Sequence, residues 1–110
     1  MNITKEKIGN YSVLNIKGRI DTFHSSDFEG VVSQLLGSGE KNLIFNCSGM
    51  NYISSSGLRV FLVTQKKVIS MDGKLYLSNM QPAIQEIFRI SGFSNLFRIF
   101  DTQEDALEDQ

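Results

Sequence analysis

The chain contains no tryptophan, one proline, one cysteine and one histidine, and these scarcities exclude several kinds of structure. Because Cys47 is the only cysteine, no disulfide can form within the chain. Cys47 and His24 are too few for the clusters that hold a metal ion. No apolar run approaches the ~20 residues that cross a bilayer. We therefore expect one domain over residues 1–110, in a reducing cytoplasm, with no cofactor and no membrane insertion.

An excess of charge of one sign is also missing, since 11 basic residues stand against 12 acidic ones and the formal net charge is −1. A nucleic-acid-binding protein needs a basic face that displaces counterions from phosphates. The charge balance therefore predicts no nucleic-acid partner. Hydrophobic residues make up 41% of the chain, which is enough for a folded core and argues against disorder.

The first third of the chain predicts a β-hairpin followed by a helix. Residues 3–8 and 11–17 have the composition of strands, and Gly9 begins a plausible tight turn between them. We expect the helix to start at a capping box formed by residues 26–29 and to end at Gly37 in the left-handed conformation. Its apolar residues recur at helical spacing, as Phe28, Val31, Val32, Leu35 and Leu36.

The rest of the chain alternates short apolar strands with helices. Residues 43–45 and 75–77 are unbroken apolar runs, which are typical of strands covered on both faces. A helix follows each of them, and the later helix is expected to start at Pro82 and to end at Gly92. A last strand, residues 97–100, precedes a final acidic helical turn.

The resulting element order is ββαβαβαβα, with Asp101 or Thr102 as the cap of the last helical turn. Parallel strands that are joined through helices need right-handed crossovers. The order therefore predicts an α/β fold with a mostly parallel sheet of four to five strands, an N-terminal hairpin and helices packed on the sheet.

Motifs of catalysis are absent from the sequence. The chain has no G-x-S-x-G elbow for a serine hydrolase and neither of the glycine-rich patterns that cradle nucleotides. His24 lies where the first helix is expected to start, and Cys47 suits a small apolar filler at a strand end. The acidic residues near the C-terminus are typical of a solvated face. We therefore expect a protein that is not an enzyme.

Three consecutive serines followed by a glycine, residues 54–57, are the unusual feature of the sequence. One serine suffices as a helix N-cap, so the other hydroxyls call for a second explanation. The partial positive charge of a helix N-terminus tolerates a phosphate. Phosphorylation there would add about 1.5–2 negative charges without unfolding the domain. The run indicates either a protein-docking surface that can be phosphorylated or serines that act only as caps and turn formers.

The helix after these serines is expected to have an inner apolar stripe and a second face. The inner stripe comprises Leu58, Phe61, Leu62, Val68 and Ile69. Val60 and Val63 lie on another side, where they either pack under the first helix or form an exposed contact patch. Arg59 follows Ser55 by one helical turn, so it is placed to pair with a phosphate on that serine.

Residues 46–58, N-C-S-G-M-N-Y-I-S-S-S-G-L, resemble the signature of the STAS domains of anti-sigma factor antagonists. That signature runs roughly D-L-S-G-V-x-x-I-D-S-S-G-L. Residues 18–21 resemble the family's G-x-[LI]-D before the first helix, and residues 80–93 resemble its third-helix segment. The similarity covers nearly the whole chain, and it implies a STAS-like fold.

The resemblance also implies a switch that phosphorylation controls. In such families the unmodified antagonist binds an anti-sigma factor, which is also a serine kinase of histidine-kinase-like fold, and this binding releases the sigma factor. Phosphorylation of the antagonist ends the binding, and a metal-dependent serine phosphatase restores it. By motif position the modified residue is Ser55, and Asp21 lies at the partner face. ATP and Mg²⁺ belong to the kinase.

Two positions depart from the family pattern, because Asn46 and Ser54 stand where aspartate is usual. They remove two negative charges beside the site and leave Ser54 and Ser56 as alternatives to Ser55. A second role also stays open, that of a constitutive STAS subunit in a larger assembly such as a lipid-transport ATPase complex or a sensory scaffold. The residues expected to bind a partner are Asp21, Ser54, Ser56, Gly57, Arg59, Val60 and Val63.

Overall fold

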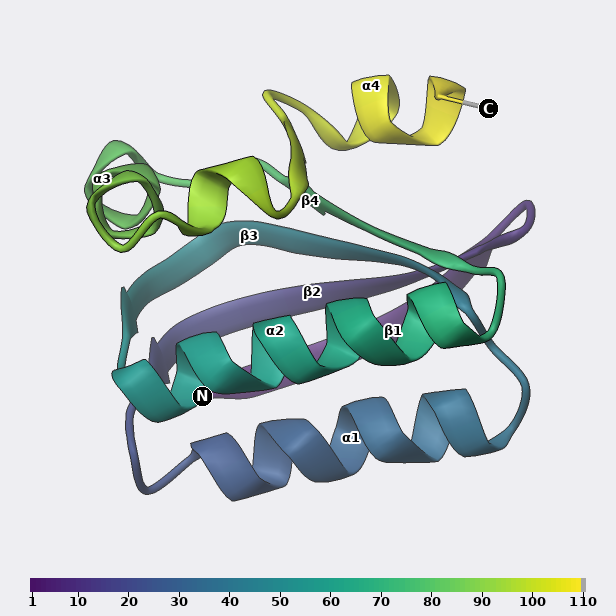
Figure 1. Ribbon diagram of the computed structural model, residues 1–110, viewed down its shortest axis with the longest axis horizontal. Helices are drawn as coiled ribbons and strands as arrows, with labels where there is room; N and C mark the ends of the chain where they lie inside the picture. Colours follow the sequence, from purple (N-terminus) through teal and green to yellow (C-terminus); the bar gives the residue numbers. More distant parts are fainter. Residues whose placement is uncertain (110) are drawn as a thin grey trace.

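The computed structural model describes residues 1–109 (Figure 1). Its strands are β1 (Asn2–Ile8), β2 (Tyr11–Ile20), β3 (Asn42–Ile53), β4 (Lys74–Ser78) and β5 (Arg98–Phe100). Its helices are α1 (Ser25–Gly37), α2 (Ser55–Ser70), α3 (Pro82–Ile90) and α4 (Gln103–Glu108), with a 3₁₀ turn at Phe93–Asn95. The predicted order of strands and helices is confirmed.

The strands form one sheet in the order β1-β2-β3-β4-β5. β1 and β2 are antiparallel and joined at Gly9, whose φ of 59° lies in the left-handed region that a tight hairpin turn requires. The pairs β2–β3, β3–β4 and β4–β5 are all parallel. The mostly parallel sheet with an N-terminal hairpin is therefore confirmed, with five strands.

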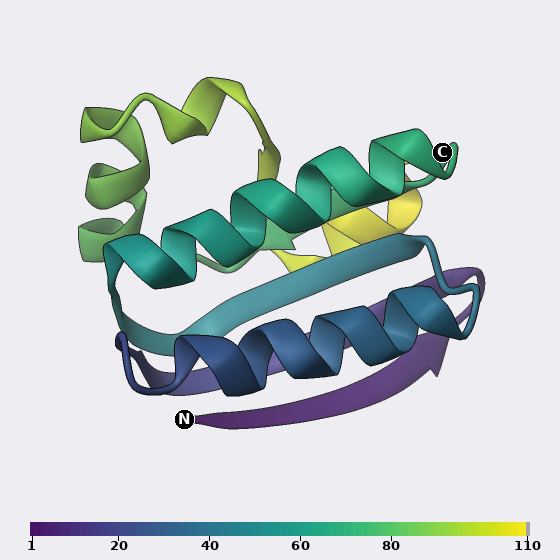
Figure 2. The same cartoon turned by 60° about the horizontal axis from the view of Figure 1, so that its bottom comes forward.

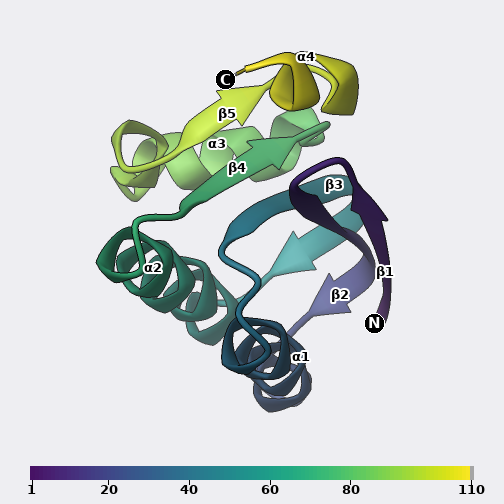
Figure 3. The same cartoon turned by 90° about the vertical axis from the view of Figure 1, so that its right-hand side faces the viewer.

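Helices cover the sheet unequally on its two sides. α1 and α2 lie side by side on one face, as Figures 2 and 3 show, and α3 adds its buried Ile84 and Phe88 to the same core. On the opposite face α4 places Ala106 over the side chains of Tyr11, Val13, Ile44 and Tyr76. The main core therefore lies under α1 and α2, and a smaller one lies under α4.

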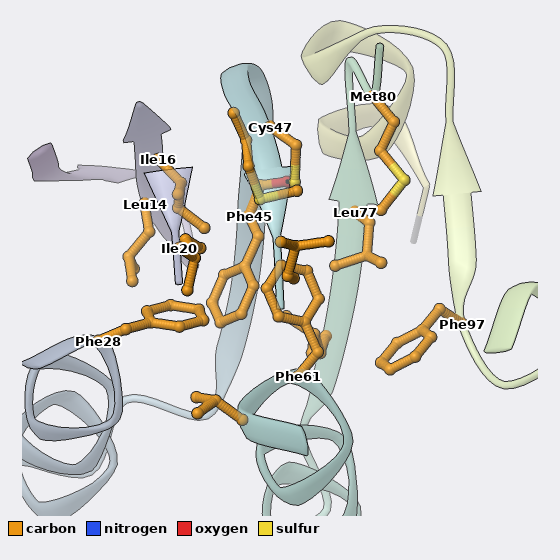
Figure 4. Close-up of a cluster of buried hydrophobic side chains, with 14 of the residues drawn as sticks. Leu14, Ile16, Ile20, Phe28, Phe45, Cys47, Phe61, Leu77, Met80 and Phe97 are labelled. Atoms are coloured by element: carbon orange, nitrogen blue, oxygen red, sulfur yellow. Dashed lines mark hydrogen bonds between the residues drawn. The ribbon is translucent and has the colours of Figure 1, made fainter. Parts of the chain in front are cut away.

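Phe61 of α2 lies at the centre of the main core. Its ring packs against Phe28 of α1 and Phe45 of β3, with centroids 5.5 and 5.1 Å apart (Figure 4). It also packs against Phe88 and Phe97, at 5.6 and 6.4 Å. These four pairs are edge-to-face, an arrangement that the ring quadrupole favours. Phe61 therefore ties α2 to α1, α3 and the sheet at once.

The long strands β2 and β3 differ from the sequence prediction. β3 continues past Phe45 to Ile53, and β2 continues to Ile20, with irregular register near Gly18. Residues 46–53 do not continue the apolar run of residues 43–45, but their backbone pairs with β2. The extension matters because it carries both strands to the place where the three serines begin.

The predicted start of α1 is wrong, whereas its predicted end at Gly37 is confirmed. The helix begins at Ser25, one residue before the expected capping box, and Ser26 is not its cap. Instead the carboxylate of Asp21 accepts a hydrogen bond of 3.0 Å from the backbone N–H of His24. At the other end Gly39, with φ of 95°, takes the left-handed conformation expected of Gly37. Both differences arise because flanking loop residues satisfy the backbone groups beyond the helix.

The inner face of α2 is also rotated from the predicted stripe. Its buried residues are Gly57, Val60, Phe61, Thr64 and Val68. Leu58 and Leu62 are only half-buried, and Ile69 is 61% exposed, so its placement in the inner stripe is wrong. The rotation follows from Gly57, which lets the start of α2 approach the sheet more closely than any larger residue would allow.

The remaining helix ends agree with the predictions. Pro82 occupies the first position of α3, and Gly92, with φ of 79°, follows that helix in the left-handed conformation. Of the two candidate caps for α4, Thr102 is the one used, since its hydroxyl accepts from the N–H of Asp105 at 3.1 Å.

Candidate functional site

The candidate site lies where β2 and β3 end beside each other. Ile20 and Ile53 are register partners, and the N–H of Ser54 donates to the carbonyl of Ile20 at 2.8 Å. The segments that follow the two strands contain Asp21 and Ser55. They therefore leave the sheet at the same end, the carboxyl end of these parallel strands (Figure 1). In open α/β sheets the carboxyl ends of parallel strands are where ligands and partners bind.

The three serines have different roles. Ser54 is 8% exposed, and its hydroxyl accepts the N–H of Gly57 at 3.2 Å as the N-cap of α2. The hydroxyls of Ser54 and Ser56 form a hydrogen bond of 2.9 Å. The Ser55 side chain is exposed and has no hydrogen-bond partner among residues 1–109. Ser55 thus offers an unoccupied hydroxyl, whereas Ser54 and Ser56 are engaged with each other.

Replacing Ser54 with alanine should lower the free energy of unfolding by about 1 kcal/mol, because the N-cap bond is lost and Gly57 keeps an unsatisfied N–H. Replacing Ser55 with alanine should change it by less than about 0.5 kcal/mol, because that side chain is exposed. Urea denaturation of the two variants measures both values. Equal losses in the two variants would contradict the separate roles assigned to these serines.

Gly57 and Val60, both expected to bind a partner, are buried. Gly57 is buried, and a Cβ atom there would lie 2.8 Å from Cγ1 of Ile53 and 2.9 Å from Cγ2 of Ile20. Val60 is 4% exposed and belongs to the main core. Of the two alternatives for the valines, Val60 packs inside the fold while Val63 is 44% exposed. Ser54 is buried as well, so its part is to hold the helix start.

Asp21 is half-buried at the start of the connection between β2 and α1. Burial raises the pKa of its carboxyl, but hydrogen bonds from the backbone and ring of His24 outweigh that effect, so the pKa lies below its ordinary value. The Nδ1 atom of His24 lies 2.8 Å from the Asp21 oxygen that also accepts its N–H. Asp21 therefore carries a fixed negative charge at the edge where Ser55 is exposed.

Arg59 lies beside a small polar depression at the starts of α1 and α2. The depression has a volume of about 210 Å³, and its lining is Ser25, Ser26, Glu29, Ser56, Arg59 and Val60. The first turn of α2 contains no acidic residue. A negative group on Ser55 would therefore meet the positive end of the helix, with the exposed Arg59 guanidinium one turn away.

The structure adds an aromatic residue that no sequence motif singles out. Phe23, in the same connection as Asp21, is 84% exposed and meets His24 edge-on at 5.4 Å between ring centroids. The sequence hint is its position: Phe23 is an aromatic residue that lies outside the helical repeat of apolar residues beginning at Phe28. Nearby, the Arg19 guanidinium lies 4.2 Å above the ring of Tyr52.

The two remaining side chains with reactive chemistry are those of Cys47 and His24. Cys47 is fully buried in the core, and this burial raises the pKa of its thiol to about 12. His24 contacts Asp21, and no hydrogen bond joins it to a serine within residues 1–109. In the same range no group of three histidine, cysteine or carboxylate side chains could hold a metal ion. Over the described residues, no helix combines the length and apolarity needed to cross a membrane.

Comparison with known proteins agrees with the fold. The family model of the STAS domain matches residues 2–106. BtrV of Bordetella bronchiseptica, named as a candidate anti-sigma factor antagonist, is 29% identical over 106 residues, covering 96% of this chain and 91% of BtrV. The anti-sigma-B factor antagonist of Staphylococcus aureus is 23% identical and covers 94% and 96% of the two chains.

A solved structure supports the same fold at low sequence identity. The phosphorylated form of the Bacillus cell fate determinant SpoIIAA superposes with a TM-score of 0.77, at 20% identity over 97% of both chains. The chain belongs to the STAS domain family, and its relatives include proteins named as anti-sigma factor antagonists.

Proposed function

We propose that this chain is an anti-sigma factor antagonist whose binding to an anti-sigma factor is ended by phosphorylation of Ser55. In the unmodified state it binds the anti-sigma factor and so releases the sigma factor. The anti-sigma factor is also the serine kinase, of histidine-kinase-like fold, and a serine phosphatase restores the unmodified state. ATP and Mg²⁺ act in the kinase, so this chain supplies only the accepting hydroxyl and the docking surface.

The observation that carries the proposal is the different environment of the three serine hydroxyls. Ser55 is exposed and unoccupied, while Ser54 caps α2 and Ser56 is bonded to Ser54. A phosphate on Ser55 would be stabilised by the N-terminus of α2, so modification leaves the fold intact. Its added charge would instead act on the protein that contacts this edge.

The charge pattern of the site supports a partner that phosphate repels. The docking edge comprises exposed or half-buried residues, namely Asp21, Phe23, Ser55, Ser56 and Arg59, together with Val63 further along α2. Phosphorylation would place about two negative charges beside Asp21, whose own charge is held by His24. A partner surface that complements the unmodified edge would then face a desolvated, unmatched charge. Such mismatches cost several kcal/mol in protein interfaces.

Incubation with the anti-sigma factor kinase and ATP should add one phosphate, and mass spectrometry of peptides should locate it on Ser55. Ser55→Ala should abolish incorporation, whereas Ser56→Ala should still accept one phosphate, on Ser55. A phosphate on Ser54 or Ser56, or none at all, would contradict the assignment of the accepting hydroxyl.

Binding provides the second half of the test. Ser55→Asp should weaken binding to the anti-sigma factor at least about tenfold, because it places a fixed charge in the interface. Ser55→Ala should bind as the wild type does. If Ser55→Asp instead co-purifies undiminished with a larger membrane or scaffold assembly, the chain is a constitutive subunit and the switch is excluded.

A further inference from the structure

A groove runs between α1 and α2 on the outer side of the two helices. It has a volume of about 430 Å³. Val32 and Val60, 3% and 4% exposed, lie at its bottom, and its more exposed apolar surface comes from Leu36 of α1 and Val63 of α2, with Met71 at its far end. Pockets of this size and lining are typical of binding sites. We propose that this groove binds an amphipathic helix of the anti-sigma factor, an inference that rests on the proposed function.

The groove is continuous with the candidate site. Glu29 and Val60 line both the groove and the polar depression that contains Ser56 and Arg59. A partner bound at the exposed Ser55 therefore has an uninterrupted path along α1 and α2. The wall formed by α2 extends from Val60 to Met71, about 17 Å at 1.5 Å per residue. That length matches about three turns of a helix.

The walls of the groove decide the backbone conformation of its occupant. Both walls are helices, whose backbone N–H and C=O groups are paired internally. The hydroxyl of Thr64, the polar group of the buried floor, is also satisfied, since it donates to the carbonyl of Val60 at 2.7 Å. An extended peptide would find no backbone partners here and would bury unsatisfied groups. A helix satisfies its own backbone and presents only side chains to the groove.

The charges on the rim set the polarity of that helix. Glu29 lies on the α1 side near Ser55, and Lys67 lies on the α2 side toward the far end. Both are exposed, and among residues 1–109 neither forms an ion pair with another side chain. A complementary helix carries an acidic residue toward Lys67, while the Ser55 end offers it both the Glu29 carboxylate and the Arg59 guanidinium.

One valine and one isoleucine on the same helix provide a matched test. Val63 lines the groove and is 44% exposed, whereas Ile69 is 61% exposed and lies outside the lining. Val63→Glu should weaken binding of the anti-sigma factor about tenfold or more, because it puts a charge in the apolar seam. Ile69→Glu should leave the affinity within about twofold of wild type. Circular dichroism checks that both variants are folded, and Val63→Ser replaces Val63→Glu if the latter is not.

The binding results distinguish a failure of the groove proposal from a failure of the proposed function. If the anti-sigma factor binds the wild type, loses affinity for Ser55→Asp and binds Val63→Glu and Val63→Ser unchanged, the groove is not used although the switch holds. If Val63→Glu and Ile69→Glu weaken binding equally, the effect is one of net charge and the groove proposal fails. If the wild type binds no anti-sigma factor, the proposed function itself fails.

Site-specific labelling tests the occupant directly. Because Cys47 is buried and unreactive, Val63→Cys and Ile69→Cys each offer one accessible thiol for an environment-sensitive dye. The anti-sigma factor should shift the emission to the blue at position 63 and leave position 69 unchanged. A shift that appears when the labelled chain alone is concentrated would identify a second copy as the occupant and overturn the proposal.

Hydrogen exchange in the anti-sigma factor identifies the bound segment. We expect one newly protected stretch of about 11 residues, with apolar side chains at the i, i+3, i+4 and i+7 spacing of a helix. Protection of a segment with strictly alternating apolar residues would show an extended occupant and contradict the helix.

Discussion

Phe61→Ala should lower the free energy of unfolding by about 3–5 kcal/mol, the usual cost of emptying a phenylalanine site in a core. Phe61 has no exposed surface and packs against four other phenylalanine rings, from α1, β3, α3 and the segment before β5. Those neighbours belong to different elements, so none can close the cavity without moving the element that carries it. Urea denaturation, with the midpoint and slope fitted together, measures the loss.

Phe23→Ala makes the same chemical change at an 84% exposed position and is the control for that experiment. It should alter stability by less than about 0.5 kcal/mol. A loss below about 1 kcal/mol for Phe61→Ala would mean that the core repacks around the cavity. In that case Phe61 would not be the residue that holds α1, α2 and α3 together.

Gly57→Ala should destabilise the protein by about 1–2 kcal/mol and disturb the start of α2, because overpacking of a core costs about 1–3 kcal/mol. The new Cβ would lie under 3.0 Å from two buried isoleucine side chains, Ile20 and Ile53, and 3.3 Å from the carbonyl oxygen of Ile20. The gain in helix propensity, up to about 1 kcal/mol, offsets only part of that cost. The helix start would move outward and carry Ser55 with it.

Gly30→Ala isolates the close contact from the effect of helix propensity. Gly30 lies inside α1, and a Cβ atom added there would have no neighbour within 4 Å outside the backbone of its own helix. Alanine should therefore stabilise the protein at this position by about 0.5–1 kcal/mol. The two variants should differ by about 1.5–3 kcal/mol, with effects of opposite sign. Stabilisation by both substitutions would show that α2 does not depend on a glycine where it meets β2 and β3.

Helix ends and strand lengths show where prediction from sequence succeeds and fails. Pro82 and Gly92 mark the ends of α3 correctly because each acts through its own backbone. The local sequence pattern does not predict the start of α1. Asp21, four residues before the helix and outside the predicted capping box, accepts a hydrogen bond from the backbone N–H of His24. The apolar run predicts a strand only over residues 43–45, whereas β3 continues to Ile53 because residues 46–53 pair with β2.

The faces of α2 show a similar limit for the candidate site. Helical spacing places Phe61 and Val68 inward, and both are buried. It also places Ile69 inward, where the structure leaves it 61% exposed, because a periodic pattern leaves the rotation of a helix free by tens of degrees. The close approach at Gly57 sets that rotation. The same rotation buries Val60 and leaves Val63 on the edge of the groove.

Sequence alone determined the order of strands and helices and the location of the serine run before α2, since local hydrophobic spacing and turn residues encode both. Only the tertiary structure decided which serine is available. The contact of Gly57 with Ile20 and Ile53 places Ser54 against the end of β2, where it caps the helix, and turns Ser55 outward. Three identical side chains in a row differ only through the packing of residues distant in the chain.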